Sequence, residues 1–151
     1  MPLKPFFHEA REIARLAHKA RCVALANGFV GLCKTKGADV VVFGSLANKD
    51  AFFRVDSDID LCILDPGPLT FREIETLAGY FFAGTKFDLW DKSDIKPDVL
   101  DEVARFGVRH FDISAIRVEL RKLLGVPVDV LTPNGLPDKF RAAVLAEAMP
   151  V

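Results

Sequence analysis

The chain has 151 residues, half of them hydrophobic and 13 of them phenylalanine, so it can bury one core and we expect a single domain over residues 1–151. A formal net charge of −1 argues against a dedicated nucleic-acid binder, because such proteins carry a basic surface. No apolar run reaches a membrane span, and Glu9 and Glu12 stand where a signal peptide would be apolar, so we predict a cytoplasmic protein without a membrane partner.

The first predicted element is a helix from Pro5 to about Phe29. Its apolar residues recur at three- and four-residue steps, which is typical of an amphipathic helix; they are Ile13, Leu16, Ala17, Ala20, Val23 and Ala24. Asn27-Gly28 is a plausible stop signal, and Gly37 precedes the first strand. We therefore expect residues 1–37 to form a helical segment that covers one face of a sheet.

Two apolar runs separated by a polar loop follow, in VVVFGSLANKDAFFRVDSDIDLCIL from Val40 to Leu64. Side chains two residues apart on a strand share a face, so Asp58 and Asp60 project together while Ile59 faces the core. Carboxylates so close resist ionising together unless a cation lies between them. The pattern predicts a Mg²⁺ site, and because Mg²⁺ usually completes its shell with waters and phosphates, the expected partner is a nucleoside triphosphate.

Gly44 and Ser45 end the first apolar run. They are suited to bind the phosphates of the nucleoside triphosphate that lie away from the metal site. A residue without Cβ lets backbone N–H groups approach a phosphate, and a serine adds a hydroxyl donor. Either feature alone is common, since Gly-Ser often only ends a strand and a DxD often lies in a solvated turn. The combination of the two is much more specific.

Three further elements are expected before residue 110. Thr70 with Glu73 forms a capping-box pattern that opens a helix to about Phe82. A strand is expected at 86–91, with Asp88 in its middle, and a helix at 97–106. The cysteines, Cys22, Cys33 and Cys62, lie in apolar settings without a CxxC pattern, which indicates buried free thiols.

The C-terminal stretch 111–151 resembles a partial repeat of the stretch before it. A helix at 113–124 leads to Val128-Asp129-Val130, an apolar-Asp-apolar pattern like the one around Asp88, and then to a helix at 137–148. We expect a strand at 128–130 that extends the sheet edge or pairs with another subunit in a homo-oligomer.

The motifs VVVFGS at 40–45 and SDIDLCIL at 57–64 together resemble the nucleotidyltransferase superfamily related to DNA polymerase β, and in particular its minimal, MNT-type members. The resemblance implies an α/β (α+β) fold with a small mixed sheet flanked by helices, like the polymerase β palm, and a catalytic core at 38–110. It also implies a third metal-binding carboxylate. We assign that role to Asp88, with Asp129 as the alternative, because the separation of Asp88 from Asp60 leaves room for one helix between adjacent strands.

The resemblance further implies the activity. The expected enzyme moves a nucleoside monophosphate, AMP from ATP, to a hydroxyl with two Mg²⁺, and the acceptor would be a HEPN-family toxin partner. The family often places an arginine after Gly-Ser, whereas this chain has Leu46-Ala47-Asn48-Lys49, so Lys49 or Arg54 would have to replace it. Two alternatives stay open, a non-catalytic antitoxin or regulatory binding module and a small-molecule, aminoglycoside-type transferase.

Overall fold

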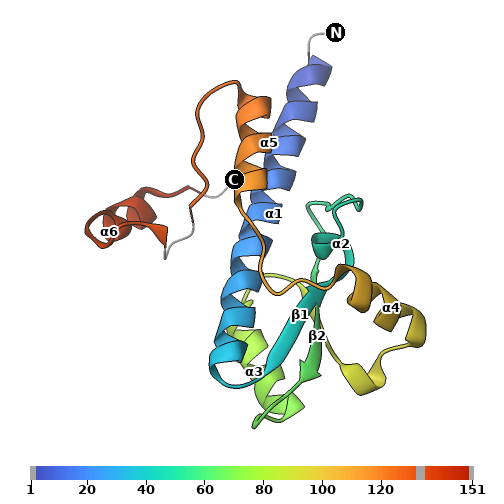
Figure 1. Ribbon diagram of the computed structural model, residues 1–151. Coiled ribbons are helices and arrows are strands. Elements are labelled where there is room, and N and C mark those ends of the chain that lie inside the picture. The colour runs from blue at the N-terminus through green and yellow to red at the C-terminus, as the bar shows by residue number, and fades with distance from the viewer. Residues whose placement is uncertain (1–2, 132–134, 150–151) are drawn as a thin grey trace. The chain divides into compact units, whose positions relative to one another are not determined.

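The computed structural model describes residues 3–131 and 135–149 (Figure 1). Its elements follow one another as α1 (Leu3–Thr35), β1 (Asp39–Phe43), α2 (Gly44–Ala47), β2 (Ile59–Asp65), α3 (Phe71–Phe81), β3 (Phe87–Asp91), the 3₁₀ turn η1 (Lys92–Asp94), α4 (Pro97–Phe106), α5 (Ser114–Leu124) and α6 (Asp138–Glu147). The chain divides into two compact units. One consists of residues 21–111, and the other of the first 20 residues together with those from 112 onward.

The first unit is organised around a three-stranded mixed sheet with the order β1-β2-β3. Strands β1 and β2 run antiparallel, with Val42 opposite Leu61, whereas β2 and β3 run parallel, with Asp60 opposite Asp88. The predicted α+β class and mixed sheet are confirmed, and the DxD strand lies beside the strand that carries Asp88.

The two faces of the sheet are covered by different helices. On one face, Phe29 of α1 and Phe82 at the end of α3 hold their ring centroids 5.0 Å apart, and Phe82 packs on Phe87 of β3 at 5.2 Å. The other face buries Val41, Phe43 and Cys62 against Ile95 and Val103, the latter on α4. Because side chains alternate along a strand, the even-numbered residues of β2, among them Asp60, lie on the face that α4 covers.

Helix α1 is longer than the sequence pattern predicts. It continues through Asn27-Gly28 to Thr35, and ends where Gly37 adopts φ +86° and Ala38 N–H donates to Cys33 O at 2.9 Å. A β-carbon on Gly28 would lie 2.8 Å from the Phe81 ring. The glycine thus permits close packing against α3 instead of stopping the helix, so that prediction was wrong.

The segment after α4 returns along the outer edge of β1. Val42 and Val108 exchange both backbone hydrogen bonds, at 2.8 and 2.7 Å. The side-chain amide of Asn27 then accepts from Phe111 N–H at 2.7 Å and donates to Phe111 O at 2.9 Å. One side chain of α1 therefore fixes the path of the connection that leaves the sheet.

The second unit contains the first part of α1 with α5 and α6, and Figure 1 shows α5 beside the upper part of α1. Residues 127–130 have no regular secondary structure, so the predicted strand at 128–130 was wrong. Pro127 removes a backbone donor, and a three-residue strand without a hydrogen-bonded neighbour has little to stabilise it.

Other local predictions are confirmed. Thr70 accepts from Glu73 N–H at 3.2 Å while the Glu73 carboxylate accepts from Thr70 N–H at 2.7 Å, which completes the capping box. The three cysteines are free and buried, and burial raises the pKa of each thiol to about 11. Within the described residues, no helix is both long and apolar enough to cross a membrane.

Candidate active site

The turn from β1 into α2 places Gly44 against the DxD motif. Gly44 has φ +70°, a left-handed conformation that residues with a Cβ rarely adopt. A β-carbon at this position would collide with Oδ2 of Asp60. Both the backbone conformation and the close approach therefore require glycine here.

Ser45 follows in the first turn of α2 and is half-buried. Within the described part of the chain, its hydroxyl forms no hydrogen bond with another protein group. Asn48 N–H donates to Gly44 O at 3.0 Å and closes the short helix. The turn thus holds Gly44 against Asp60, and the Ser45 hydroxyl and the first backbone N–H groups of α2 follow directly.

The loop from 48 to 58 brings Asp58 to the start of β2. Phe53 is 1% exposed and anchors the loop, while Arg54 N–H donates to the Ser57 hydroxyl at 2.8 Å and Ser57 N–H donates back to Arg54 O at 3.1 Å. Asp58 therefore lies just before the strand, and Ile59 N–H then donates to Lys86 O at 3.1 Å.

Asp58, Asp60 and Asp88 converge, because each offers a carboxylate oxygen within 4.8 Å of those of the other two. Two oxygens on opposite sides of a Mg²⁺ stand about 4.2 Å apart. Small side-chain movements would therefore let the three carboxylates share one cation, and an all-oxygen donor set suits Mg²⁺. The residues present fit the metal that the sequence motif indicates.

Burial and neighbouring carboxylates raise the pKa of two members of the cluster. Burial raises the pKa of Asp60 to about 7, with further contributions from the negative charges of Asp58, Asp88 and Glu102. The pKa of Asp88 is also raised, by burial and then by its hydrogen bond and charge interaction with Asp58. Raised pKa values of this kind are expected where carboxylates lie close together without a cation between them.

A cavity of about 320 Å³ adjoins Asp60 of the carboxylate cluster. Gly44 and Asp60 line one part of it, and Trp90 and Glu102 line another. Sequence reasoning singled out neither Trp90 nor Glu102. Trp90 could have been found from the sequence, because it lies two residues after Asp88 on a predicted strand and so shares its face. Glu102 could not, because its position depends on how α4 packs on the sheet.

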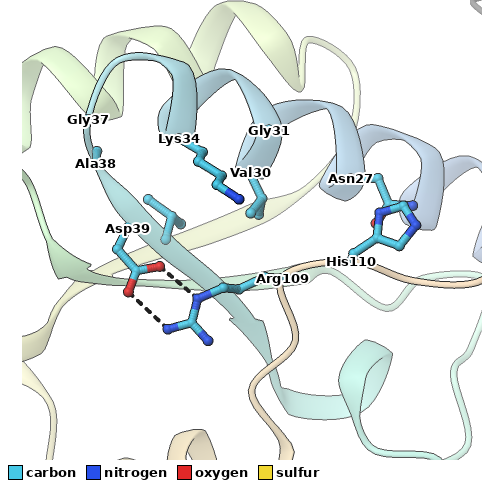
Figure 2. Close-up of a pocket in the computed structure, with 10 residues that line it drawn as sticks. Asn27, Val30, Gly31, Lys34, Gly37, Ala38, Asp39, Arg109 and His110 are labelled. Carbon is cyan, nitrogen blue, oxygen red and sulfur yellow. Dashed lines mark hydrogen bonds and ion pairs between the residues drawn. The ribbon is translucent and has the colours of Figure 1, made fainter.

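A second cavity, of about 690 Å³, lies along α1 and the start of β1 (Figure 2). Arg109 donates to both carboxylate oxygens of Asp39 at its rim, at 2.8 and 2.9 Å, and holds the pKa of Asp39 below its usual value. Asn27, Lys34 and His110 supply the other polar side chains of the lining. The residues predicted to act in catalysis do not line this cavity.

The structure also places the residues that the sequence left as alternatives. Arg54 pairs with Asp56 at 3.3 Å and its side chain is 70% exposed, and Lys49 is exposed in the loop. Among the described residues, the three carboxylates that converge are Asp58, Asp60 and Asp88. Asp88 is therefore the carboxylate found with Asp58 and Asp60.

Comparison with known proteins gives one family match. Residues 29–151 match the family described as the nucleotidyltransferase domain. A chain in the crystal structure of a mutant toxin-antitoxin complex, MntA-HpeT, is similar at 17% identity, with 66% of this chain and 84% of that chain covered and a TM-score of 0.39. No curated protein matches the chain.

Proposed function

The chain belongs to the nucleotidyltransferase domain family, and on that premise we propose that it transfers a nucleoside monophosphate from a nucleoside triphosphate, ATP in the first instance, to a hydroxyl acceptor. The observation that carries the proposal is the convergence of Asp58, Asp60 and Asp88 beside the Gly44-Ser45 turn. Neither feature alone would suffice.

Each part of the site has a proposed role. Asp58, Asp60 and Asp88 hold Mg²⁺, two ions by analogy with polymerase-type sites. A metal held there would supply the charge that offsets the negative charge developing on the α-phosphate and on the leaving group. Ser45 and the backbone N–H groups at the start of α2 bind the β- and γ-phosphates, where the absence of a Cβ on Gly44 keeps the approach open.

The reaction would proceed as an in-line displacement. The acceptor oxygen forms a bond to the α-phosphorus, the bond to the β-phosphate oxygen breaks, and pyrophosphate leaves. Asp88 is the exposed member of the cluster, so it can meet an incoming acceptor and take the proton from its hydroxyl.

We propose a protein hydroxyl as the acceptor, on a HEPN-family toxin partner in a reducing cytoplasm. The support is the resemblance of VVVFGS and SDIDLCIL to MNT-type proteins. The buried cysteines are compatible with that compartment.

The competing candidate is a binding module that masks its partner without transferring a nucleotide. The observation that favours it is the missing arginine after Gly-Ser, which neither Lys49 nor Arg54 visibly replaces, since Lys49 is exposed and Arg54 is paired with Asp56. The three convergent carboxylates oppose it. A small-molecule transferase has no comparable observation in its favour.

Labelled ATP separates these candidates. The protein is incubated with Mg²⁺, a candidate HEPN partner and ATP labelled at either the α- or the γ-phosphate. Nucleotidyl transfer predicts that the α-label alone becomes covalently attached, and that Asp58→Asn abolishes the attachment while Asp56→Asn, an exposed neighbour outside the cluster, retains it. Tight complex formation without attachment of either label, to the partner or to small hydroxyl acceptors, would support the binding module instead.

A further inference from the structure

The cavity beside Asp60 extends from the turn at Gly44 to β3, the outer strand of the sheet. Gly44 and Asp60 line one part of it, while Trp90 and Lys96 line the part formed by β3 and the start of α4. Its volume of about 320 Å³ exceeds what a metal ion and its waters need. The space is therefore large enough for an organic part of the substrate.

Trp90 is placed to meet that part of the substrate. It lies two residues after Asp88 on β3 and opposite Cys62 of β2, so it projects from the same face of the sheet as the carboxylates. Its neighbour across the strands, Cys62, is fully buried, yet Trp90 is 44% exposed. A large aromatic surface thus stays open within a cavity that reaches the candidate site.

The strand order gives the direction in which a nucleotide would lie. Gly44 follows β1, Asp60 is on β2 and Asp88 is on β3, and neighbouring strands are about 4.8 Å apart. A triphosphate whose outer phosphates lie at Gly44 and whose α-phosphate lies at the carboxylates runs from β1 toward β3. The nucleoside that follows the α-phosphate then lies on the side of Trp90.

The polar groups of the cavity match a nucleobase rather than an apolar ligand. Lys96 is a donor, whereas Asp94 and Glu102 are acceptors, and all three line the same cavity as Trp90. The edge of a purine carries both ring-nitrogen acceptors and an exocyclic group that donates or accepts. Val99 and Ile95 add apolar side chains to the same lining.

We propose that this cavity is the nucleobase site and that Trp90 is the surface on which the base stacks, an inference that rests on the proposed nucleotidyl transfer. Stacking on an aromatic side chain is available to any base, because every base has a flat π-face. Trp90 would then contribute to affinity for the nucleoside, while the mixed donors and acceptors around it suit the polar edge of a base.

The chain contains a single tryptophan, so its own fluorescence reports on this site. With Mg²⁺ present, ATP should quench and shift the emission of Trp90, whereas inorganic triphosphate, which has no base, should bind without that change. Calorimetric titration of the same two ligands gives their affinities independently. Binding of ATP without any change in emission would overturn the inference.

Substitutions give the second readout. Trp90→Ala should weaken ATP binding by about 5- to 150-fold and leave the affinity for triphosphate unchanged, while Trp90→Phe, which keeps a ring, should retain most of the affinity. Tyr80→Ala is the matched control, because Tyr80 is an aromatic residue that is 82% exposed on α3 and does not line the cavity.

The outcomes distinguish a failure of the nucleobase site from a failure of the proposed nucleotidyl transfer. If triphosphate and ATP bind with equal affinity to both the wild type and Trp90→Ala, the nucleobase site is wrong and nucleotidyl transfer survives. If neither ligand binds to the folded wild-type protein, the proposed function fails and the nucleobase site fails with it.

Discussion

Asp60 and Asp88 stand directly opposite each other across the parallel strands β2 and β3. Side chains at paired positions of a sheet share a face, so the two carboxylates are held close by the backbone and not by a chance choice of rotamer. Asp58 joins them from the end of the preceding loop. A site built in this way crowds carboxylates together, and a bound cation would offset their mutual repulsion.

Magnesium should therefore stabilise the folded protein. At a hundredfold excess over its dissociation constant, a ligand that binds only the native state adds about 2.7 kcal/mol, which corresponds to a rise of several degrees in Tm for a chain of this size. We expect the Mg²⁺-dependent rise, measured by thermal unfolding, to disappear in Asp58→Asn and in Asp88→Asn. Asp56→Asn should keep it, because Asp56 pairs with Arg54 outside the cluster. An unchanged rise in the two cluster variants would contradict the metal site.

The raised pKa of Asp60 predicts how stability depends on pH without divalent ions. Its folded pKa of about 7 lies above the ordinary value of 3.8, so between these values the native state binds more protons than the unfolded state and loses stability as pH rises. Asp60→Asn removes this loss. From pH 4 to 7, the free energy of unfolding of the variant should therefore rise relative to that of the wild type. The expected rise is about 1–2 kcal/mol after allowance for solvent screening.

Denaturant unfolding of both proteins in EDTA at several pH values measures this difference. Above about pH 8 the difference should stay constant, because Asp60 is then ionised in both states. A difference that shrinks as pH rises would show that the Asp60 carboxylate is not held in the environment described.

Gly44 should not tolerate a methyl group. Alanine would have to adopt φ near +70°, and its Cβ would displace the Asp60 carboxylate. We expect Gly44→Ala to lower the free energy of unfolding by about 1–3 kcal/mol and to weaken the response to Mg²⁺. Gly79→Ala is the control, since a Cβ there meets nothing within 4 Å in α3, and it should stabilise by about 0.5–1 kcal/mol. Full stability with an undiminished Mg²⁺ response in Gly44→Ala would refute the assignment.

Asn27 should hold the connection at 107–111 in place. Alanine at this position would leave both backbone groups of Phe111 without their side-chain partners, at a cost of about 1–3 kcal/mol. Amide hydrogen exchange should accelerate at Phe111, whose N–H loses its acceptor. Thr76→Ala removes an exposed hydrogen bond to Arg72 O and should change stability by less than about 0.5 kcal/mol. Slow exchange retained at Phe111 in Asn27→Ala would contradict this role.

The sequence allowed the strands and the DxD cluster to be predicted because strand alternation is a local property. Asp60 and Asp88 both lie within apolar runs, so their faces follow from spacing alone. Strand formation also needs a neighbour, however. The run 87–89 pairs with β2, whereas the similar run at 128–130 follows Pro127 and forms no strand. Local composition could not distinguish the two.

The rest of the site depends on packing between distant segments. Trp90 and Glu102 line one cavity only because Val103 of α4 packs on the face that holds Cys62. Gly28 was predicted to stop the helix. The structure gives another reason for glycine there, because a side chain would clash with the Phe81 ring of α3. Periodicity assigns a helix its apolar stripe but does not say which partner that stripe meets.

The buried cysteines have a practical consequence. Burial raises the pKa of each thiol to about 11, so the reactive thiolate is scarce at pH 7, and all three side chains are closed to a bulky reagent. A cysteine introduced at an exposed position such as Tyr80 would react with maleimide far ahead of Cys22, Cys33 and Cys62. Fluorophores or cross-linkers could thus be attached at one chosen point while the native sulfur atoms stay in the core.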